Sequence, residues 1–559
     1  MSNENEYLKS ALNTLHSKDN DFIVIGLTGR TGSGCTTTAN ILASNKSEID
    51  HNLSPKTDEI NNVDRKNLIL QNYFDKNWTP FKHLRVSAIL TLMLLNDHTD
   101  SEIKAFLRQL PYIRTDDIDF LLVQKSNMTS QTQDTDFFIS YLSELTGNIR
   151  NKIEEASFIK LYQLLGKNAR RSGKVICPQL ESGKFFTLSH RINETISTIH
   201  SENNDKNIST YIVIDAFRNS LEASFFQERY ASFYLLAVSC HENIRQKRLK
   251  DNKKLSQDSI NSIDTNEYSS VNMGSSKIFT DQDIRGCLEK ADIYVDSSST
   301  YSSKDPLVES NAIEDQQRLT NQIIKFVCLA RKPGLITPSP EERCMQVAYT
   351  SKLNSGCISR QVGAVVTNPS YSVKSVGWND APYGQVPCNL RSVDKLLNSE
   401  DNIAYSPFEM TNVKFRNKIS SLAIKNITDI GYNPSYCFKS HYNELEGEKN
   451  QVHTRSLHAE ENAFLQISKD GGSGVNNGYL FTTASPCELC AKKAYQLGMA
   501  KIFYIDPYPG ISTEHILNAG LSKTQPELVL FNGVVGRAFH NLYTPISAYK
   551  DELNALLSN

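Results

Sequence analysis

Short apolar runs separated by longer amphipathic stretches mark roughly the first half of the chain. Phe22–Leu27 (FIVIGL), Tyr211–Asp215 (YIVID) and Phe233–Val238 (FYLLAV) are such runs, and Ala291–Ser299 (ADIYVDSSS) offers one more. Runs of this length with little polar alternation are typical of strands buried on both faces of a parallel sheet. Because helical patterns lie between them, the sequence predicts an α/β domain.

Two other stretches in this half have a different pattern. Val86–Leu95 (VSAILTLMLL) is the longest apolar run. It predicts a buried helix, since a membrane span needs about 20 residues. Lys253–Ser276 is rich in Ser, Asn and Asp and predicts a loop.

A proline-rich segment then divides the chain. Ala330–Glu342 (ARKPGLITPSPEE) interrupts any helix. Beyond it, VGAVVT from Val362, GYLFTTA from Gly478 and KIFYIDPY from Lys501 predict strands of a second α/β domain, with polar inserts at 398–405 and 433–453. We therefore expect a polar lead-in at 1–20, a first domain at 21–330, a linker at 331–342 and a second domain at 343–559.

Composition narrows the class of protein. A chain of 559 residues is too long for one compact core. The net charge of −2 provides no overall basic field for nucleic acid. Eleven cysteines without disulfide-framework spacing, and a polar N-terminus unlike a signal peptide, predict a reduced, cytoplasmic protein without a membrane segment.

His458, Cys487 and Cys490 are the candidate ligands of a metal ion. Zn²⁺ binds imidazole and thiolate, and a catalytic zinc has three protein ligands and one position for water. Pro486 favours a helix start beside the two cysteines, where the helix dipole stabilises thiolates. Glu460, two residues after His458, then lies close to the metal without being a ligand. A structural zinc knuckle or an unrelated pair of cysteines is the alternative, although a structural site normally has four protein ligands.

These residues resemble the H-x-E…P-C-x-x-C pattern of zinc nucleoside and nucleotide deaminases. The resemblance implies a zinc cofactor that lowers the pKa of its water. It also implies that Glu460 takes the proton of that water and passes it to the ring nitrogen and then to the leaving amine.

Four longer blocks resemble the deoxycytidylate (dCMP) deaminases: SGCISRQVGAVV from Ser355, GWNDAPYGQVPC from Gly377, HAEENA from His458 and LFTTASPCELCAKKAYQLGMAKIFY from Leu480. The resemblance implies a cytidine-deaminase-like α/β/α domain and a deoxycytidine nucleotide substrate. It further implies that Asn379 and Ala459 belong to the substrate site. A purely local interpretation of the Asn379 block is a turn, and the two are compatible. Asp380 departs from the family, which has glycine there.

Relatives with a second, structural zinc have cysteines placed like Cys357 and Cys388. The remaining ligands do not align, although His441 and His453 lie in the neighbouring insert. Two buried, reduced cysteines are the alternative. Tyr508 is either an aromatic wall of the substrate site or a core residue.

The glycine-rich loop after the first strand is the second candidate site. Gly29–Thr36 (GRTGSGCT) matches the phosphate-binding pattern G-x-x-x-x-G-K-[ST], except that Cys35 replaces lysine. Backbone N–H groups and the helix dipole survive this change, but the lysine charge does not. We expect Mg²⁺ with a nucleoside triphosphate here, with Thr36 and Asp215 as the magnesium ligands. The candidate residues are Gly29, Arg30, Thr31, Gly32, Ser33, Gly34, Cys35, Thr36 and Asp215. A glycine-rich turn without a ligand is the alternative.

The first domain as a whole resembles P-loop nucleoside-monophosphate and dephospho-coenzyme A kinases. VIDAFRNSLEASFF and LLAVSCHENIRQKRL carry this likeness. Arg245 and Arg248 occupy lid-like positions, and a solvated helix face is the alternative.

Together, the two halves resemble anti-phage deoxycytidylate deaminases of the AvcD type. That resemblance implies deamination of dCMP and dCTP to deplete the deoxycytidine pool. It also implies restraint by a small inhibitory RNA, and assembly into a homo-oligomer. Two other functions stay open: a cytidine deaminase acting on RNA or single-stranded DNA, disfavoured by the net charge, and a nucleotide kinase with a zinc module, disfavoured by Cys35.

Overall fold

The computed structural model forms two compact units, which we describe separately. The first contains β1 to α15 together with Asn532–Asn559, and the second is Pro338–Phe531. The structure describes Tyr7, Ser10, Ala11 and residues 22–557 except 56–58, 129–134, 268–276, 299–311, 451, 470, 473 and 507–511. The predicted lead-in at 1–20 and Tyr508 therefore lie largely or wholly outside the described residues.

The first unit is built on a six-stranded sheet in the order β11-β5-β4-β1-β3-β2. All of its pairs are parallel except β11 with β5. The central strands are apolar and buried along nearly their whole length, as expected when helices cover both faces. The strands are β1 (Phe22–Thr28), β2 (Lys82–Arg85), β3 (Thr210–Phe217), β4 (Phe233–Ser239), β5 (Ile293–Asp296) and β11 (Gly533–Val534).

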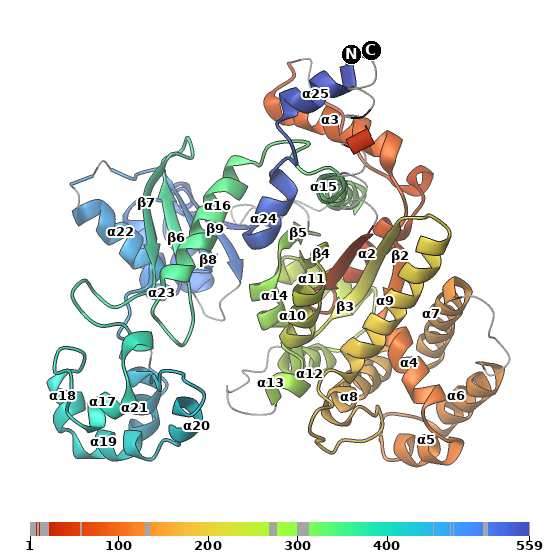
Figure 1. Cartoon of the computed structure of the whole chain (residues 1–559), viewed down its shortest axis with the longest axis horizontal. Helices are drawn as coiled ribbons and strands as arrows, with labels where there is room; N and C mark the ends of the chain where they lie inside the picture. Colours follow the sequence, from red (N-terminus) through yellow and green to blue (C-terminus); the bar gives the residue numbers. More distant parts are fainter. Residues whose placement is uncertain are drawn as a thin grey trace. The chain divides into compact units, whose positions relative to one another are not determined.

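Helices surround this sheet (Figure 1). The buried helix predicted at Val86–Leu95 is confirmed as α4. The helices are α2 (Cys35–Ala43), η1 (Lys46–Glu48), α3 (Asn62–Asn77), α4 (Val86–Asn96), α5 (Asp100–Leu107), α6 (Thr115–Met128), α7 (Thr135–Lys152), α8 (Glu155–Ser172), α9 (Thr187–Asp205), α10 (Ser220–Arg229), α11 (Glu242–Asp251), α12 (Gln257–Glu267), α13 (Lys277–Thr280), α14 (Ile284–Lys290), α15 (Ala312–Arg331), α24 (Gly536–Tyr543) and α25 (Tyr549–Leu557).

The C-terminal segment belongs to the first unit, whereas we expected it in the second domain. β11 extends the first sheet, and α24 packs against α15 (Figure 1). Val534, Ala538 and Leu542 are buried in the same apolar core as Ile23 on β1. Sequence periodicity reports which face of an element is apolar but not which core it joins, so this return of the chain was not predictable.

The second unit has a five-stranded mixed sheet in the order β10-β9-β8-β6-β7. β8, β9 and β10 are parallel, and β6 is antiparallel to both β7 and β8. The strands predicted from Val362, Gly478 and Lys501 are confirmed as β6, β8 and β9. The strands are β6 (Gly363–Thr367), β7 (Val373–Trp378), β8 (Tyr479–Ala484), β9 (Lys501–Asp506) and β10 (Glu527–Leu530).

α16 and α22 pack against this sheet, and the segment between β7 and α22 forms a small helical insert. The insert has its own apolar cluster, which includes Phe415 and Tyr436. Glu409 is fully buried in it and pairs with Arg391 and, at 2.9 Å, with Arg455. The helices are α16 (Pro340–Ser351), η2 (Lys352–Asn354), η3 (Cys388–Leu390), α17 (Val393–Leu397), α18 (Pro407–Thr411), α19 (Val413–Ser420), α20 (Lys425–Thr428), α21 (Phe438–Glu446), α22 (Ala459–Lys469), α23 (Glu488–Gln496), η4 (Ser512–Leu517) and η5 (Ser522–Thr524).

The prediction of a loop at Lys253–Ser276 is wrong in part, because α12 occupies Gln257–Glu267. Ile260 and Ile263, one helical turn apart, are buried against Leu249, and this packing outweighs the polar composition. Throughout the described residues, every helix is too short or too polar to span a lipid bilayer.

Candidate functional site

The predicted metal ligands His458, Cys487 and Cys490 come together in the second unit. Nδ1 of His458 lies 3.2 Å from Sγ of Cys487 and 3.4 Å from Sγ of Cys490. His458 immediately precedes α22, and Cys487 is the N-cap of α23. The three ligand atoms all lie within 4.8 Å of one another. Two helix N-termini thus bring the three donors to one point.

This donor set fits a zinc ion. With Zn–S near 2.3 Å and Zn–N near 2.0 Å, ligands of a tetrahedral zinc lie about 3.5–3.8 Å apart, close to the distances found here. Hydrogen bonding with Cys490 and His458 lowers the pKa of the Cys487 thiol to about 3. A thiolate is the form that binds metal. Three ligands leave the fourth position of a tetrahedral ion open, as in catalytic zinc sites.

Glu460 lies beside these ligands, near the start of α22. Glu460 is only 4% exposed, and burial raises the pKa of its carboxyl group. Thr482 Oγ1, on β8, lies 3.0 Å from Glu460 Oε1 and 2.8 Å from the carbonyl of Ala484. A carboxyl group whose pKa is raised toward neutrality can both accept and return a proton.

A cavity of about 240 Å³ opens over this centre. Glu460, Asn379 and Ala459 line it, and the cations Arg360, Lys439 and Arg455 line it as well. The ion pair of Arg455 with buried Glu409 ties the cavity wall to the insert. The cavity therefore joins the buried carboxyl group of Glu460 to positive charge suited to a phosphate.

Asn379 holds the wall of the cavity through both ends of its side chain. Its Oδ1 accepts from the N–H of Val362 at 2.6 Å, and its Nδ2 donates to the carbonyl of Arg360 at 2.6 Å. The carboxylate of neighbouring Asp380 accepts from the N–H of Ala381 at 2.8 Å. In this structure Asn379 fixes the segment that carries Arg360, and its predicted contact with substrate stays a prediction.

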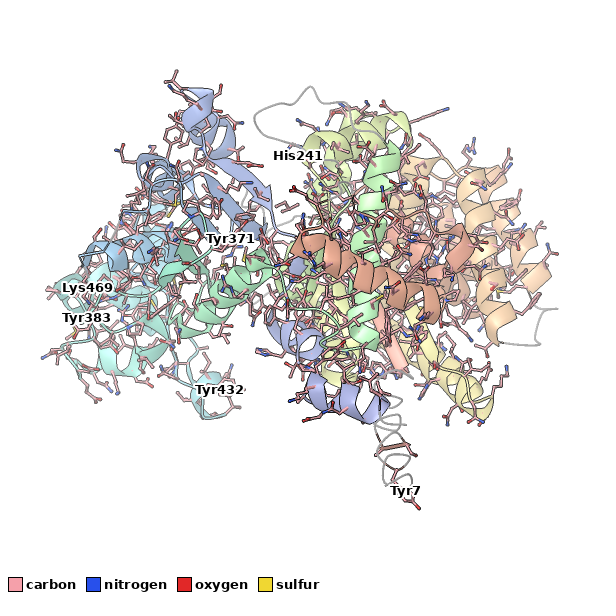
Figure 2. All side chains as sticks on the ribbon, turned by 90° about the horizontal axis from the view of Figure 1, so that it is seen from above. Tyr7, His241, Tyr371, Tyr383, Tyr432 and Lys469 are labelled. Carbon is pink, nitrogen blue, oxygen red and sulfur yellow. The ribbon has the colours of Figure 1, made fainter. Side chains whose placement is uncertain are left out.

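The loop after β7 is tied to the end of α22. Lys469 Nζ lies 4.9 Å from the centre of the Tyr383 ring, and Figure 2 shows the two side chains close to each other. Gly377, at the end of β7, permits the close approach of the strand to α22. A Cβ at Gly377 would lie 2.3 Å from the carbonyl oxygen of Ala459. The strand that leads into Asn379 is therefore packed directly on α22.

Cys357 and Cys388, predicted to hold a second zinc, line the same cavity. Cys437 lines it too, and both Cys357 and Cys437 raise the pKa of the Cys388 thiol, after the larger effect of burial. His441 lies one turn beyond Cys437, and its buried Nδ1 has no partner among the described residues. The sequence analysis missed Cys437. The i, i+4 spacing of Cys437 and His441 was a usable signal.

His453, the other histidine considered, is placed differently. Its Nε2 lies 3.7 Å from a carboxylate oxygen of Glu448, and its ring packs against Tyr442. Neither His453 nor His441 is among the residues that line the cavity of the three cysteines.

In the first unit, the glycine-rich loop connects β1 to α2. Gly32 and Gly34 have φ angles of 88° and 110°, which favour glycine. Thr36 Oγ1 donates to Asp215 Oδ2 at 3.0 Å. Burial opposes ionisation of Asp215, but the imidazole of His83, 3.7 Å away, and the hydrogen bond from Thr36 outweigh it and hold the pKa of Asp215 below the usual range. The predicted pair of Thr36 and Asp215 is thus in contact, and its role as a pair of magnesium ligands stays a prediction.

A cavity of about 650 Å³ lies at this loop, at the carboxyl ends of the parallel strands. Burial raises the pKa of the Cys35 thiol to about 12, so it carries no charge at neutral pH. Positive charge comes from other residues, which the sequence analysis largely missed. The cations that line the cavity are Arg30, Arg150, Arg218, Lys247, Arg248 and Lys253.

The two lid-like arginines differ. Arg248 lines the cavity and donates to the carbonyl and hydroxyl of Ser297. Arg245 is buried and pairs with Glu242 and Asp264, and it donates to the carbonyl of Thr31 at 3.0 Å. Arg245 therefore supports the loop from behind. It does not form a solvated helix face.

Comparison with known proteins shows what the second unit is similar to. Residues 338–506 match the model of the cytidine and deoxycytidylate deaminase zinc-binding region. Deoxycytidylate deaminase of Enterobacteria phage T2 is 29% identical over 166 residues, which is 29% of this chain and 78% of the relative. The phage T4 enzyme is 28% identical over the same length, covering 29% of this chain and 76% of the relative. Among solved structures, dCMP deaminase of cyanophage S-TIM5 is 20% identical with a TM-score of 0.20, covering 35% of this chain and 100% of that one.

Proposed function

We propose, from the deoxycytidylate deaminase-like zinc-binding region at residues 338–506, that this protein hydrolytically deaminates free deoxycytidine nucleotides to deoxyuridine nucleotides and ammonia. The observation that carries the proposal is the buried carboxyl group of Glu460 beside a three-ligand metal centre. The relatives of phages T2 and T4 are deoxycytidylate deaminases, which supports dCMP as a substrate.

His458, Cys487 and Cys490 would hold zinc. A zinc ion there would supply Lewis acidity that makes water a better nucleophile at neutral pH. Glu460 accepts a proton from the attacking water and delivers it to N3 of the cytosine ring. It then takes the remaining proton from the hydroxyl group added at C4 and passes it to the exocyclic amine, which leaves as ammonia while the C4 oxygen becomes the carbonyl of the uracil base. Burial of Glu460 suits both steps, because it raises the pKa of the carboxyl group toward the working pH.

The shape and charge of the cavity support a single nucleotide as substrate. Its volume of about 240 Å³ suits one nucleoside, and Arg360, Lys439 and Arg455 suit one or more phosphates. We propose that both dCMP and dCTP are accepted, as the resemblance of the sequence implies. Asn379 and Ala459 would contact the nucleotide directly or hold the backbone that does.

We further propose that the first unit is a P-loop nucleotide-binding domain that regulates the deaminase. The geometry that supports this is the Thr36–Asp215 pair, suited to Mg²⁺, within a cation-lined cavity. Depletion of deoxycytidine nucleotides during phage infection, restraint by a small RNA and assembly into a homo-oligomer complete the proposal and rest on the resemblance of the sequence alone.

Incubation of the zinc-loaded protein with dCMP, dCTP, cytidine and a deoxycytidine oligonucleotide tests the central proposal. We expect release of ammonia and a uracil product from the free deoxynucleotides only. Deamination of the oligonucleotide alone would instead establish a polynucleotide deaminase. Absence of any product, with zinc present at one or more equivalents per chain, would contradict the proposal.

A further inference from the structure

The helical insert of the second unit encloses a carboxylate group that solvent does not reach. Glu409 lies on α18, one of the group of short helices α17 to α21 (Figure 1), and it is fully buried. Its Oε1 accepts from the hydroxyl of Tyr436 at 2.8 Å, and its Oε2 accepts from the N–H of Ser406 at 2.9 Å. Its Oε1 also pairs with Arg391, and its Oε2 pairs with Arg455 at 2.9 Å. The orientation of this carboxylate is therefore fixed, since turning it would break several bonds at once.

The charges around Glu409 do not balance. Within the part of the chain that the structure describes, Glu409 is the one carboxylate that pairs with Arg391 or with Arg455. Burial opposes ionisation of Glu409, but Arg391 and the other donors outweigh it and hold the pKa of Glu409 below the usual range. Because arginine stays charged, the three side chains together keep one positive charge. Arg391 is fully buried, whereas Arg455 lines the deaminase cavity, so this charge is offered to the cavity.

Arg455 is held by only one corner of its guanidinium group. Among the described residues, Nη1 donates to Glu409, and the shielded Nε has no acceptor. A guanidinium presents Nε and Nη2 as two parallel donors, which can bind two oxygens of one phosphate group. Glu409 therefore holds the side chain in place without using the pair of donors that a phosphate needs.

The backbone at Arg455 is fixed independently of the insert. Arg455 lies three residues before His458, and the N–H of Leu457 donates to the carbonyl of Asp380 at 2.8 Å. The side chain of Arg455 would still be free to rotate without Glu409. An arginine that a ligand must first order loses rotamer freedom on binding, and this loss weakens the complex. Ordering by Glu409 before the substrate arrives avoids that loss.

We propose that Glu409 is a positioning residue, which makes the deaminase select nucleotides over nucleosides by holding Arg455 against the 5′-phosphate. This inference rests on the proposed function, because it assigns the phosphate contact of the same site. Glu409 itself is not among the residues that line the cavity, so it acts through Arg455. The insert thus determines a preference for phosphorylated substrates that the metal centre does not provide.

Steady-state kinetics of the full, zinc-loaded chain test the proposal. In Glu409→Gln, KM for dCMP is expected to rise about 10- to 100-fold, the usual value of a charged hydrogen bond, while kcat is unchanged. Glu400→Gln, at an exposed position of the same insert, is the matched control and is expected to behave like the parent. A KM in Glu409→Gln equal to that of this control would overturn the proposal.

A double-mutant cycle separates positioning from general damage to the insert. Arg455→Gln is expected to raise KM for dCMP at least as much as Glu409→Gln does. Adding Glu409→Gln to Arg455→Gln is expected to cause no further rise, because the side chain that Glu409 positions is already gone. A rise equal to the product of the two single effects would show that Glu409 acts independently of Arg455, and would overturn the proposal.

A further variant guards against unfolding, since Glu409→Gln leaves Arg391 buried without a carboxylate. Arg391→Met combined with Glu409→Gln removes both buried charges. It is expected to keep the zinc content and melting temperature of the parent and to show the same rise in KM. A folded double variant with the KM of the parent would contradict the positioning role.

Binding measurements distinguish failure of this inference from failure of the proposed function. Calorimetry uses the full chain with Glu460→Ala, which is expected to bind dCMP and deoxycytidine without converting them. Adding Glu409→Gln is expected to weaken dCMP about 10- to 100-fold and to leave deoxycytidine, which has no phosphate, unaffected. Equal losses for both ligands would overturn the positioning role. Absence of dCMP turnover by the parent would instead contradict the proposed function, and the calorimetry would still decide the role of Glu409.

Discussion

The hydroxyl of Thr482 lies 3.0 Å from the carboxyl group of Glu460, in the buried space between β8 and α22. Thr482 holds a carboxyl group that makes no contribution to the metal ligand set. We therefore predict that Glu460→Ala keeps its metal and its fold but loses activity by about 10²–10⁴-fold, the usual range for general acid–base catalysis. The measurements are turnover of dCMP, zinc content and the circular dichroism spectrum.

Glu400→Ala is the matched control, since Glu400 is an exposed glutamate of the same unit. It is expected to retain the activity of the parent. Activity above about a tenth of the parent in Glu460→Ala would remove Glu460 from the proton-transfer role.

Removal of a metal ligand gives a different result. In Cys487→Ala we predict loss of both zinc and activity, because one of three donors is gone. Atomic absorption on the purified variant checks the metal content. Full zinc in this variant would exclude Cys487 from the ligand set, whatever its activity.

Among the described residues, His458, Cys487 and Cys490 alone come together closely enough to hold a metal ion, so a second zinc at Cys357, Cys388, Cys437 and His441 stays a prediction, which would give two zinc ions per chain. Cys437→Ser is expected to reduce the content to one and to lower the melting temperature, since binding of a structural metal contributes to folding. Cys177→Ser, in the first unit, is the control and is expected to keep both ions. One zinc per wild-type chain would show that these cysteines are simply reduced thiols.

The proposed role of the glycine-rich loop can be tested independently of zinc. Thr36→Ala removes the hydroxyl group and Asp215→Asn removes the negative charge of the hydrogen-bonded pair at the loop, and both are expected to weaken binding of Mg²⁺-nucleotide. If the nucleotide regulates deamination, the coupling would be about 1–3 kcal/mol, or roughly 5- to 150-fold in affinity. Nucleotide titrations of the full chain, with deaminase activity followed in cells before and after phage challenge, measure both effects. Unchanged binding and unchanged regulation in both variants would reduce the loop to a turn.

Close packing of β7 on α22 predicts a stability defect. A Cβ at Gly377 would lie 2.3 Å from the carbonyl of Ala459 and 2.4 Å from the amide nitrogen of Ala463. Backbone on both sides must shift, and Gly377→Ala is expected to destabilise the second unit by about 1–3 kcal/mol. Gly474→Ala is the control, because a Cβ there meets no atom within 4 Å. Urea denaturation followed by tyrosine fluorescence compares the two, and equal midpoints would contradict the packing argument.

The metal centre was predictable because its residues carry their chemistry in short sequence patterns. His458 and Glu460 are two residues apart, and Cys487 and Cys490 are three residues apart. The members of each pair therefore lie close together in the local chain, whatever the rest of the fold. Thr482 and Arg455 were not predictable in the same way. A threonine in a strand and an arginine in a polar insert have no distinctive spacing, and only the fold brings them to Glu460 and to the cavity.

In the first unit, too, some features could be predicted from the sequence and others could not. Apolar runs predicted β1, β3, β4 and β5, because strands buried on both faces have little polar alternation. β2 (KHLR) is a polar edge strand and gave no such signal. Cys35 suggested a loop without positive charge, yet Arg150, Arg218 and Lys253 reach the same cavity from distant segments.

The return of the chain from the second unit to the first affects how the protein is made. β11 completes the edge of the first sheet at β5, but it follows the whole second unit in the sequence. At about 5–20 residues per second, the ribosome needs roughly 10–40 s to pass from Pro338 to Asn532. During that interval β5 presents the unpaired backbone of an edge strand, which is a template for wrong pairing. The nascent first unit therefore waits for its last strand, and this waiting time is the period in which chaperones would have the most to protect.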